Sequence, residues 1–378
     1  MKILHLASFS GNIGDNASHM GLRKILSELL NFNQIENIEI RDFYKSTSKK
    51  YKKYFDETFV DLCNNYDLVI WGGGGYLDYW VPDSKTGSTF DISNDIMDKI
   101  IPPTVITSVG CVPGNKVPNG NKEKFNNFLK YISHSKKFHL LLRNDGSYEH
   151  VKENFGNDLA INFSTILDNA FHYEHKKNGI FPAVRDYVAF CIADDQIIMD
   201  GEGATKFSKD KYYREISAVV NYLIKVHKLD VCFVPHRAYD IKSINHILNN
   251  LDDKYIRNNI LVAPYMVGDN GANYLFGIYK NSILTIGDRF HSNVCGVSLG
   301  IKTIGLSALS RVRFMYDSIG LKDSYLEIEE NFSTNLIQKI DILLNTDLED
   351  YKKKYFNKLN NLRNESINKY KNIFSLYF

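Results

Sequence analysis

The stretch SILTIGDRFHSNVCGVSLGIKTIGL, residues 282–306, carries the pattern that decides the fold. A short apolar run at 282–286 is followed by a glycine, an amphipathic run at 291–299 and a second apolar run at 302–306. Two short apolar runs separated by a helical pattern predict parallel strands joined by a right-handed crossover. The stretch therefore predicts one βαβ unit of an α/β fold.

The same alternation continues on both sides of this unit. Further strands are predicted at 2–7, 67–71, 104–109, 138–143, 187–192, 231–235 and 260–263. Further helices are predicted at 16–30, 121–135, 147–155, 212–228, 241–251, 274–280 and 311–319. Apolar strands separated by helices are typical of parallel sheets that are buried on both faces.

A polar, aperiodic stretch at 172–186 separates two halves of comparable size. It predicts an N-terminal α/β domain at 1–175 and a C-terminal α/β domain at 187–330, with C-terminal helices at 331–378. Ligands of such sheets bind outside the carboxyl ends of the strands, so two facing halves predict a site in the cleft between them.

Composition excludes several classes of protein. The 378 residues hold 46 Lys+Arg and 44 Asp+Glu, a net charge of +2, without the basic excess of a nucleic-acid-binding protein. No run approaches the ~18 apolar residues of a spanning helix, and the N-terminus lacks the pattern of a signal peptide. The five cysteines are odd in number and widely spaced, so we expect no disulfide framework, no metal site and a cytoplasmic location.

The tail, residues 349–378, differs from the rest. It has seven Lys/Arg against three Asp/Glu, and Tyr351, Tyr355, Leu359 and Leu362 recur at helical spacing. A basic amphipathic helix can lie on an anionic membrane surface. The same pattern suits a terminal helix that packs on a domain with its lysines in solvent, which is the interpretation we favour.

Two glycine-containing loops follow predicted strands. In the first, Gly11 and Gly14 allow a tight turn, and Asp15 or Asn16 can cap the next helix, whose N–H groups could face an anion or a hydroxyl-rich ligand. A well-capped turn without a ligand explains these residues equally well. The loop does not match GxGxxG, so a dinucleotide is not favoured.

The second loop has four consecutive glycines at 72–75. Four positions without side chains exceed what a turn requires and favour close approach of a ligand. The absence of a following GK[ST] excludes a phosphate-binding P-loop. Tyr76, Asp78, Tyr79 and Trp80 come next and could hydrogen-bond and stack on a sugar, or belong to the core.

Cationic residues follow two strands of the second half. Pro235, His236 and Arg237 end one strand, while Arg289 and His291 lie where the quoted stretch turns from strand to helix. Arginine offers a planar fork for a carboxylate or phosphate, and histidine delivers protons near neutral pH. Together the two motifs predict an anion site with an acid beside it.

In their order along the chain, these motifs resemble the polysaccharide pyruvyl transferase family. The matching positions are 11–15, 72–75, Arg143, Ser147, Asp168, Pro235-His236, 289–292, Gly296 and Gly300. The resemblance spans about residues 3–320. Arg311 stands where the family commonly carries lysine, which keeps the charge but changes the contact geometry.

The resemblance implies a GT-B-like fold, with two Rossmann-like parallel-sheet domains facing a cleft and a C-terminal amphipathic helix. It implies a pyruvyltransferase that moves the enolpyruvyl group of phosphoenolpyruvate onto a sugar of a cell-surface polysaccharide precursor, forming a pyruvate ketal and releasing phosphate. Arg289, which would hold the donor, and His291, the general acid, would be catalytic. The implied donor-binding residues are Arg289, Phe290, His291, His236, Arg237, Arg311 and Arg143. The implied acceptor-binding residues are Gly14, Asp15, Asn16, Gly73, Gly74, Gly75, Tyr76 and Asp78.

We expect no cofactor besides phosphoenolpyruvate as donor substrate. The expected partner is a lipid-linked or nucleotide-linked sugar acceptor, with no nucleic acid, and peripheral contact with the inner membrane surface is left open. One alternative is a nucleotide-sugar glycosyltransferase of the same fold, with Asp269 or Asp288 at the ribose. Another is an inactive assembly subunit, against which the presence of Arg289 and His291 speaks.

Overall fold

The computed structural model describes residues 1–44, 46–176 and 185–378, so the centre of the predicted boundary at 172–186 lies outside the described residues. Its contacts divide the chain into two units. The first comprises Met1–Ser10, Leu22–Asn169 and Asn361–Phe378, and the second comprises Gly11–Gly21 and Ala170–Asn360. The later part of the loop after the first strand, from Gly11, thus belongs with the second unit. The domain ranges 1–175, 187–330 and 331–378 stay predictions.

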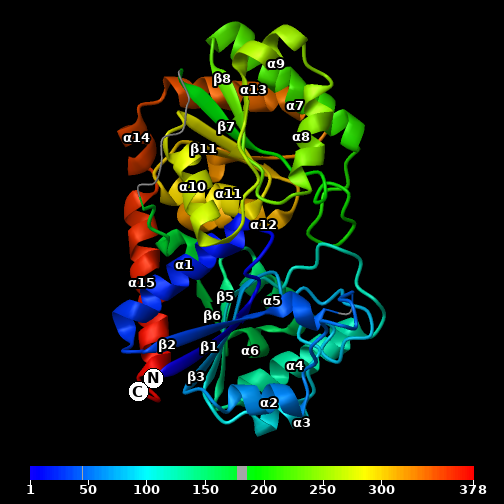
Figure 1. Cartoon of the computed structure of the whole chain (residues 1–378), viewed down its shortest axis with the longest axis vertical. Coiled ribbons are helices and arrows are strands. Elements are labelled where there is room, and N and C mark those ends of the chain that lie inside the picture. Colours follow the sequence, from blue (N-terminus) through cyan, green and yellow to red (C-terminus); the bar gives the residue numbers. More distant parts are fainter. Residues whose placement is uncertain (45, 177–184) are drawn as a thin grey trace. The chain divides into compact units, whose positions relative to one another are not determined.

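The first unit is built on a six-stranded parallel sheet of order β2-β1-β3-β4-β5-β6 (Figure 1). Its strands are β1 (Lys2–Ala7), β2 (Gln34–Glu39), β3 (Leu68–Gly74), β4 (Thr104–Val109), β5 (Phe138–Arg143) and β6 (Ser164–Ile166). Its helices are η1 (Ile40–Phe43), α2 (Glu57–Cys63), α3 (Asn94–Lys99), α4 (Asn121–His134), α5 (Ser147–Phe155) and α6 (Asn157–Ala160). Three further helices, α1 (Ile13–Leu29), η2 (Asn169–His172) and α15 (Phe356–Phe374), contain residues of both units.

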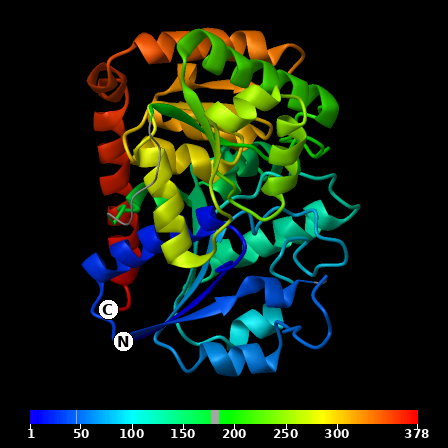
Figure 2. The ribbon, with the colours of Figure 1, turned by 45° about the horizontal axis from the view of Figure 1, so that its top comes forward.

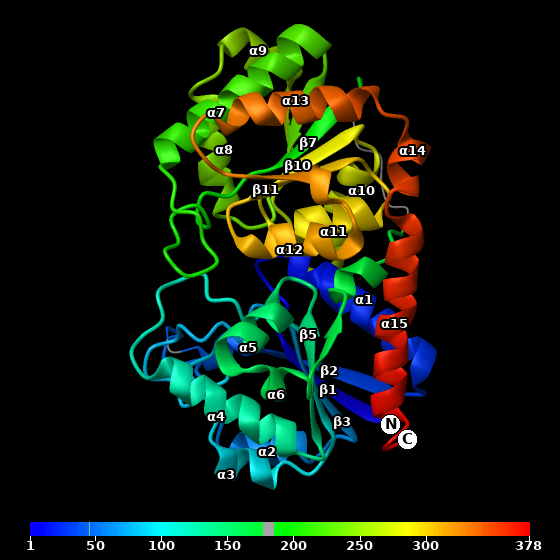
Figure 3. The same cartoon turned by 180° about the vertical axis from the view of Figure 1, so that it is seen from behind.

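Both faces of this sheet are covered, as the apolar strands predict. On one face, Leu4 and Trp71 belong to a core that includes residues of α2, α3, α4 and α5 (Figure 3). On the other face, Ile3 and Ile70 pack with residues of α1 and α15. Neighbouring residues of a strand alternate between the two cores because side chains of a strand point to opposite faces in turn.

The C-terminal tail contributes to these cores. Tyr370 and Phe374 lie in the core formed with α1, and the Tyr370 hydroxyl donates a hydrogen bond to Asn169 Oδ1 at 2.9 Å. In the second unit, Tyr351 and Tyr355 are each only 1% exposed. The apolar stripe of the tail is therefore buried against protein.

The second unit is built on another six-stranded parallel sheet, of order β12-β11-β10-β7-β8-β9. Its strands are β7 (Tyr187–Cys191), β8 (Asp230–Phe233), β9 (Ile260–Val262), β10 (Leu284–Gly287), β11 (Thr303–Ser307) and β12 (Tyr325–Glu327). Its helices are α7 (Lys209–Tyr222), η3 (Leu223–His227), α8 (Asp240–Leu248), α9 (Asp253–Asn259), α10 (Gly268–Lys280), α11 (Phe290–Ser298), α12 (Ser310–Ile319), η4 (Lys322–Ser324), α13 (Phe332–Asn345) and α14 (Leu348–Lys353). Helices α7 and α13 lie side by side, with the Tyr212 and Phe332 rings 5.9 Å apart (Figure 2).

The two parallel sheets confirm the predicted fold class. The βαβ unit predicted at 282–306 is β10, α11 and β11, and the two strands pair in parallel. Strands β2, β6 and β12 were not predicted, and all three lie at sheet edges. Edge strands are less buried and can carry polar residues, as in the sequence QIENIE of β2.

The strand order of the second sheet changes direction at its centre. The chain builds β7, β8 and β9 outward in one direction, and then β10, β11 and β12 in the other. The loops after β7 and β10 therefore diverge at their carboxyl ends, where open α/β sheets bind ligands. Among the described residues, none of the helices combines the length and the apolar character needed to cross a membrane.

Candidate functional site

An arginine cluster lies at the carboxyl edge of the second sheet. Arg237 follows β8, Arg289 follows β10, and Arg311 lies in the first turn of α12, after β11. All three act on Asp195, in the loop after β7. Burial raises the pKa of the Asp195 carboxyl, but Arg289, Arg237 and Arg311 outweigh burial and hold this pKa below its usual value. Three of the predicted donor-binding arginines thus lie close enough to Asp195 to lower the pKa of its carboxyl.

Arg289 is fixed by a buried carboxylate. Its guanidinium donates from Nε to Asp240 Oδ2 at 2.9 Å and from Nη2 to Asp240 Oδ1. Asp240 is fully buried and also accepts hydrogen bonds from the backbone N–H groups of His236 and Arg237. Burial alone lowers the pKa of Arg289, but Asp240 and Asp195 outweigh it and raise this pKa well above its usual value. Arg289 is therefore a permanently charged and immobile fork.

His291 lies beside this fork, at the start of α11, and contacts the glycine loop from the beginning of the chain. A Cβ added to Gly14 would lie 2.4 Å from His291 Cβ and 2.6 Å from its Nδ1. The Asp15 Oδ1 oxygen lies 3.8 Å from His291 Nδ1, and both side chains are largely buried. Phe290 packs edge-on against the imidazole at 5.5 Å. The structure thus joins Gly14 and Asp15, predicted for the acceptor, to the predicted acid.

The loop is held to the second unit by hydrogen bonds of its own. The Ile13 N–H donates to the His236 carbonyl at 3.3 Å, and Asn16 Nδ2 donates to Asp269 Oδ1 at 3.3 Å. Asn12 Oδ1 accepts from the Gly14 N–H at 3.0 Å, which shapes the turn. These contacts explain why Gly11–Gly21 belongs to the second unit.

Gly14→Ala is expected to displace the His291 side chain, because neither Cβ can move without shifting a backbone segment. We expect kcat to fall at least about tenfold, because a small displacement of a catalytic group lowers the rate strongly. Thermal unfolding and turnover of Gly14→Ala are compared with those of the wild type and of Gly268→Ala, whose added Cβ meets nothing within 4 Å but whose φ of 72° strains a side chain, so that it should lose stability and keep turnover. Equal activity of Gly14→Ala and the wild type would show that the close packing of Gly14 on His291 does not affect turnover.

His236 is neutral in this setting. Burial lowers its pKa well below the usual value, and the nearby positive charges of Arg289 and His291 add to the effect. Its Nε2 forms a hydrogen bond of 2.6 Å with the Tyr279 hydroxyl. A neutral imidazole cannot attract an anion by charge, so a donor-binding role for His236 would rest on shape or hydrogen bonding.

Asp288 stands directly before Arg289 and is fully buried. Its Oδ2 accepts hydrogen bonds from the Tyr212 hydroxyl at 2.6 Å and from the Ala193 N–H at 2.8 Å. Burial raises its pKa to about 7, although both hydrogen bonds oppose the shift. Asp288 therefore ties the loop after β10 to the loop after β7, and it is not exposed to a ribose.

The raised pKa of Asp288 predicts how stability depends on pH. The folded protein keeps a proton that the unfolded chain releases near pH 3.9, so unfolding free energy falls between about pH 4 and about pH 7 and then levels off. Asp288→Asn keeps an oxygen for both hydrogen bonds and removes this titration. We expect it to be more stable than the wild type by about 2–4 kcal/mol above pH 7, and nearly equal at about pH 4. Urea unfolding across this range measures the difference, and a constant difference would contradict it.

The glycine run predicted for the acceptor lies in the first unit. Gly72, with φ of 125°, accepts no side chain because a Cβ would lie 2.3 Å from the Thr107 carbonyl oxygen. Gly73 and Gly74 end β3, and Gly75 follows them. Close packing of β3 against β4 therefore requires glycine at position 72 and explains part of the run of four glycines.

The aromatic residues after the glycines are mainly core residues. Tyr76 is 5% exposed, and its hydroxyl accepts a hydrogen bond from the Ser8 N–H at 2.8 Å. Tyr79 is 2% exposed and stacks on Phe125 at 4.8 Å. Asp78 is half-buried and is the residue of this group best placed for a polar ligand.

Arg143 belongs to a carboxylate network of the first unit. It ends β5, is 3% exposed, and pairs with Asp145 at 2.7 Å and Asp168 at 3.5 Å. Burial lowers the pKa of Arg143, but Asp145, Asp168 and Asp78 outweigh it and raise this pKa. Arg143 is therefore already paired with carboxylates of its own unit, which neutralise its positive charge. The arginine cluster is built by the second unit alone.

Asp195 and Asp240 were not predicted as site residues. Asp195 comes soon after a predicted strand and directly after Asp194. The rule that ligands bind at the ends of parallel strands could have identified it. Nothing local distinguishes Asp240, which becomes important because its carboxylate meets Arg289.

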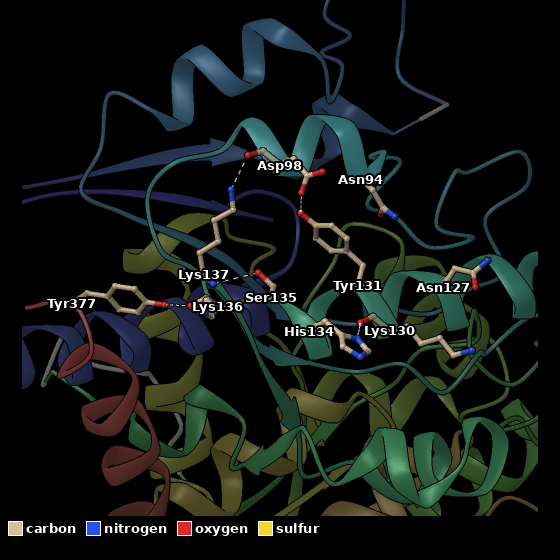
Figure 4. Close-up of a pocket in the computed structure, with 10 residues that line it drawn as sticks. All are labelled: Asn94, Asp98, Asn127, Lys130, Tyr131, His134, Ser135, Lys136, Lys137 and Tyr377. Atoms are coloured by element: carbon tan, nitrogen blue, oxygen red, sulfur yellow. Dashed lines mark hydrogen bonds between the residues drawn. The ribbon is translucent and has the colours of Figure 1, made fainter.

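A wide groove of about 830 Å³ lies on the first unit, away from these residues. It is lined by Asn94, Asp98, Asn127, Lys130, Tyr131, His134, Ser135, Lys136, Lys137 and Tyr377 (Figure 4). Lys137 precedes β5, so the groove lies at the amino ends of the strands. The Tyr131 hydroxyl donates to Asp98 Oδ1 at 2.6 Å, and Lys137 Nζ donates to the Asp98 carbonyl at 2.8 Å. These polar groups bind one another at the edge that sheet ligands do not use.

Comparison with known proteins agrees with this geometry. The polysaccharide pyruvyl transferase family model matches residues 12–310, most of the chain, which include Gly14, Asp15, His291 and, of the arginine cluster, Arg237 and Arg289. No curated protein sequence matches the chain. Among solved structures, S. aureus MnaA, solved with UDP, has a TM-score of 0.53 at 12% identity and covers 91% of this chain and 88% of its own. UDP-GlcNAc 2-epimerase from Methanocaldococcus jannaschii has a TM-score of 0.50 at 12% identity, with coverage of 92% and 94%. These likenesses establish a GT-B-type fold, and the match over residues 12–310 shows that the chain belongs to the polysaccharide pyruvyl transferase family.

Proposed function

We propose that the chain transfers the enolpyruvyl carbons of phosphoenolpyruvate to two hydroxyls of one sugar in a cell-surface polysaccharide precursor, forming a pyruvate ketal and releasing phosphate. Membership of the family supports pyruvyl transfer. The observation that carries the proposal is the arginine cluster beside His291, built within one unit. Guanidinium forks bind carboxylate and phosphate groups, and phosphoenolpyruvate carries both.

His291 is the proposed general acid. It would protonate C3 of the enol, which makes C2 electrophilic. One sugar hydroxyl would then attack C2, and a second hydroxyl of the same sugar would displace phosphate, which takes the electron pair of its bond to C2. Of the two hydroxyl protons, one replaces the proton given to C3 and the other leaves with phosphate. The reaction therefore balances without a cofactor.

The surroundings of His291 suit this role. Asp15 lies on the Nδ1 side of the imidazole, which leaves Nε2 as the nitrogen proposed to deliver the proton. Arg289 would hold the donor: Asp240 accepts from its Nε and from Nη2, and Nη2 also donates to Asp195 Oδ1 at 3.2 Å, the side on which the donor would bind. Arg237 and Arg311 would share the remaining negative charge.

The acceptor site is proposed for the first unit. Gly73, Gly74 and Gly75 lie at the carboxyl edge of its sheet, where the Tyr76 ring packs on Gly74 and the half-buried Asp78 lies next to Gly75. A sugar hydroxyl could bind the Asp78 carboxylate there. The contacts of Gly14, Asp15 and Asn16 favour a role beside His291 for that loop, so we propose that it orients the acid.

We propose that the protein acts in the cytoplasm, with a lipid-linked or nucleotide-linked acceptor. The five cysteines are free and buried, which suits a reducing compartment. A peripheral contact with the inner membrane surface would use exposed lysines of the tail, such as Lys353, since Tyr351 and Tyr355 are buried. Such a contact would be electrostatic and weakened by salt.

Turnover by the purified protein tests the proposal. We expect phosphate release that requires both phosphoenolpyruvate and a lipid-linked or nucleotide-linked galactose or N-acetylhexosamine. Omission of either substrate is the control. Transfer of sugar from a nucleotide sugar to such an acceptor, with no phosphate release from phosphoenolpyruvate, would contradict the proposal and favour a glycosyltransferase.

A further inference from the structure

The arginine cluster already holds a carboxylate that belongs to the chain. Asp195 Oδ2 accepts from Arg237 Nη1 at 2.6 Å, and Asp195 Oδ1 accepts from Arg289 Nη2 at 3.2 Å. Each oxygen of one planar carboxylate thus faces a different guanidinium. This is the arrangement by which a pair of arginines binds the carboxylate of a ligand.

The two carboxylates of the cluster differ in mobility. Asp240 is fully buried and is held by Arg289 and by two backbone N–H groups. The Asp195 side chain is 24% exposed, and that of its partner Arg237 is 43% exposed. Asp240 is therefore a fixed part of the fold, whereas Asp195 lies at the accessible side of the arginines.

The backbone next to Asp195 is anchored independently. The neighbouring Asp194 is buried, accepts a hydrogen bond from the Tyr213 hydroxyl and pairs with Lys209 Nζ at 3.1 Å. A rotation of the Asp195 side chain can therefore release Arg237 and Arg289 without movement of the whole loop.

The balance of charge around the arginines favours rotation of the Asp195 side chain when an anionic ligand binds. Arg237, Arg289 and Arg311 carry three positive charges, and Asp195 and Asp240 cancel two of them. An anionic ligand that reached the same guanidiniums with Asp195 in place would meet a second negative charge at contact distance, which opposes binding. If Asp195 turns away, the ligand takes over both its hydrogen bonds and its charge.

We propose that Asp195 is an internal substitute for the carboxylate of the donor: it pairs with Arg237 and Arg289 before the donor binds and is displaced when the donor binds. The pair Arg237 and Arg289 is then the carboxylate subsite, and Arg311 remains for the phosphate. This inference rests on the proposed function for the identity of the donor, while binding of simple anions tests it independently of turnover.

The test measures pyruvate and inorganic phosphate binding to the wild type and Asp195→Asn by calorimetry at fixed ionic strength. If Asp195 fills the subsite about nine-tenths of the time, its removal tightens pyruvate binding about tenfold. Phosphate binding is expected to tighten less than about threefold, since phosphate does not need the same pair. Asp253→Asn is the matched control, because it removes the same charge from an exposed ion pair with Arg257 in the same unit.

The other outcomes contradict the inference. Weaker or unchanged pyruvate binding by Asp195→Asn would show that Asp195 only positions the arginines. An equal or larger gain for phosphate would overturn the carboxylate assignment, and the same gain in Asp253→Asn would reduce the effect to net charge. Failure of the proposed function would appear differently, as a wild type that binds pyruvate but releases no phosphate from phosphoenolpyruvate in the presence of the acceptor.

Discussion

His291→Ala is expected to lower kcat for pyruvyl transfer by about 10²–10⁴-fold, the usual contribution of a general acid. The reason is positional: His291 lies beside Arg289, against Gly14 and within 3.8 Å of the Asp15 carboxylate. Binding of the donor should change little, because the arginines remain. Phosphate release measured at saturating phosphoenolpyruvate gives kcat directly.

Two controls make this result specific. His134→Ala removes an exposed histidine of the first unit and should keep full activity. Added imidazole should restore part of the activity of His291→Ala, because a free imidazole can enter the vacated space and deliver the proton. A folded His291→Ala protein with wild-type kcat would show that another group supplies the proton.

Arg289→Met is expected to abolish turnover and to destabilise the second unit by about 3–5 kcal/mol. The substitution leaves Asp240, which is fully buried, without its charged partner. Activity should be lost because the donor loses its fixed guanidinium fork. Urea unfolding and the turnover assay are measured on the same protein.

A double variant separates the two effects. Arg289→Met combined with Asp240→Asn removes the unpaired charge but keeps an oxygen for the N–H groups of His236 and Arg237. It should recover much of the lost stability and none of the activity. Recovery of turnover together with stability would show that Arg289 serves the fold and does not bind the donor.

The features that could be predicted from the sequence are those that depend on residues close to one another along the chain. The βαβ pattern at 282–306 and the buried strands were identified because apolar periodicity reports burial. The edge strands β2, β6 and β12 were missed because half-exposed strands carry polar residues. Arg237, Arg289 and His291 were found because strand ends in parallel sheets face ligands, whereas Arg143 and Arg311 came from the family resemblance.

Sequence reasoning could not predict contacts between distant segments. Nothing in the glycine loop near Gly14 shows that it reaches His291, and nothing local shows that Asp240 neutralises Arg289. The partners of Arg143 likewise depend on how β5 and β6 align. Such pairings arise from tertiary packing, which residue type and spacing do not encode.

The proposed reaction converts the enol of phosphoenolpyruvate into a ketal on a sugar. The most direct measurement is mass spectrometry and NMR of the acceptor after reaction in deuterated water. We expect a new methyl group that carries one deuterium per transferred pyruvyl group, with one phosphate released. An acceptor that keeps an unlabelled enol ether, or gains no three-carbon group at all, would contradict the proposed reaction.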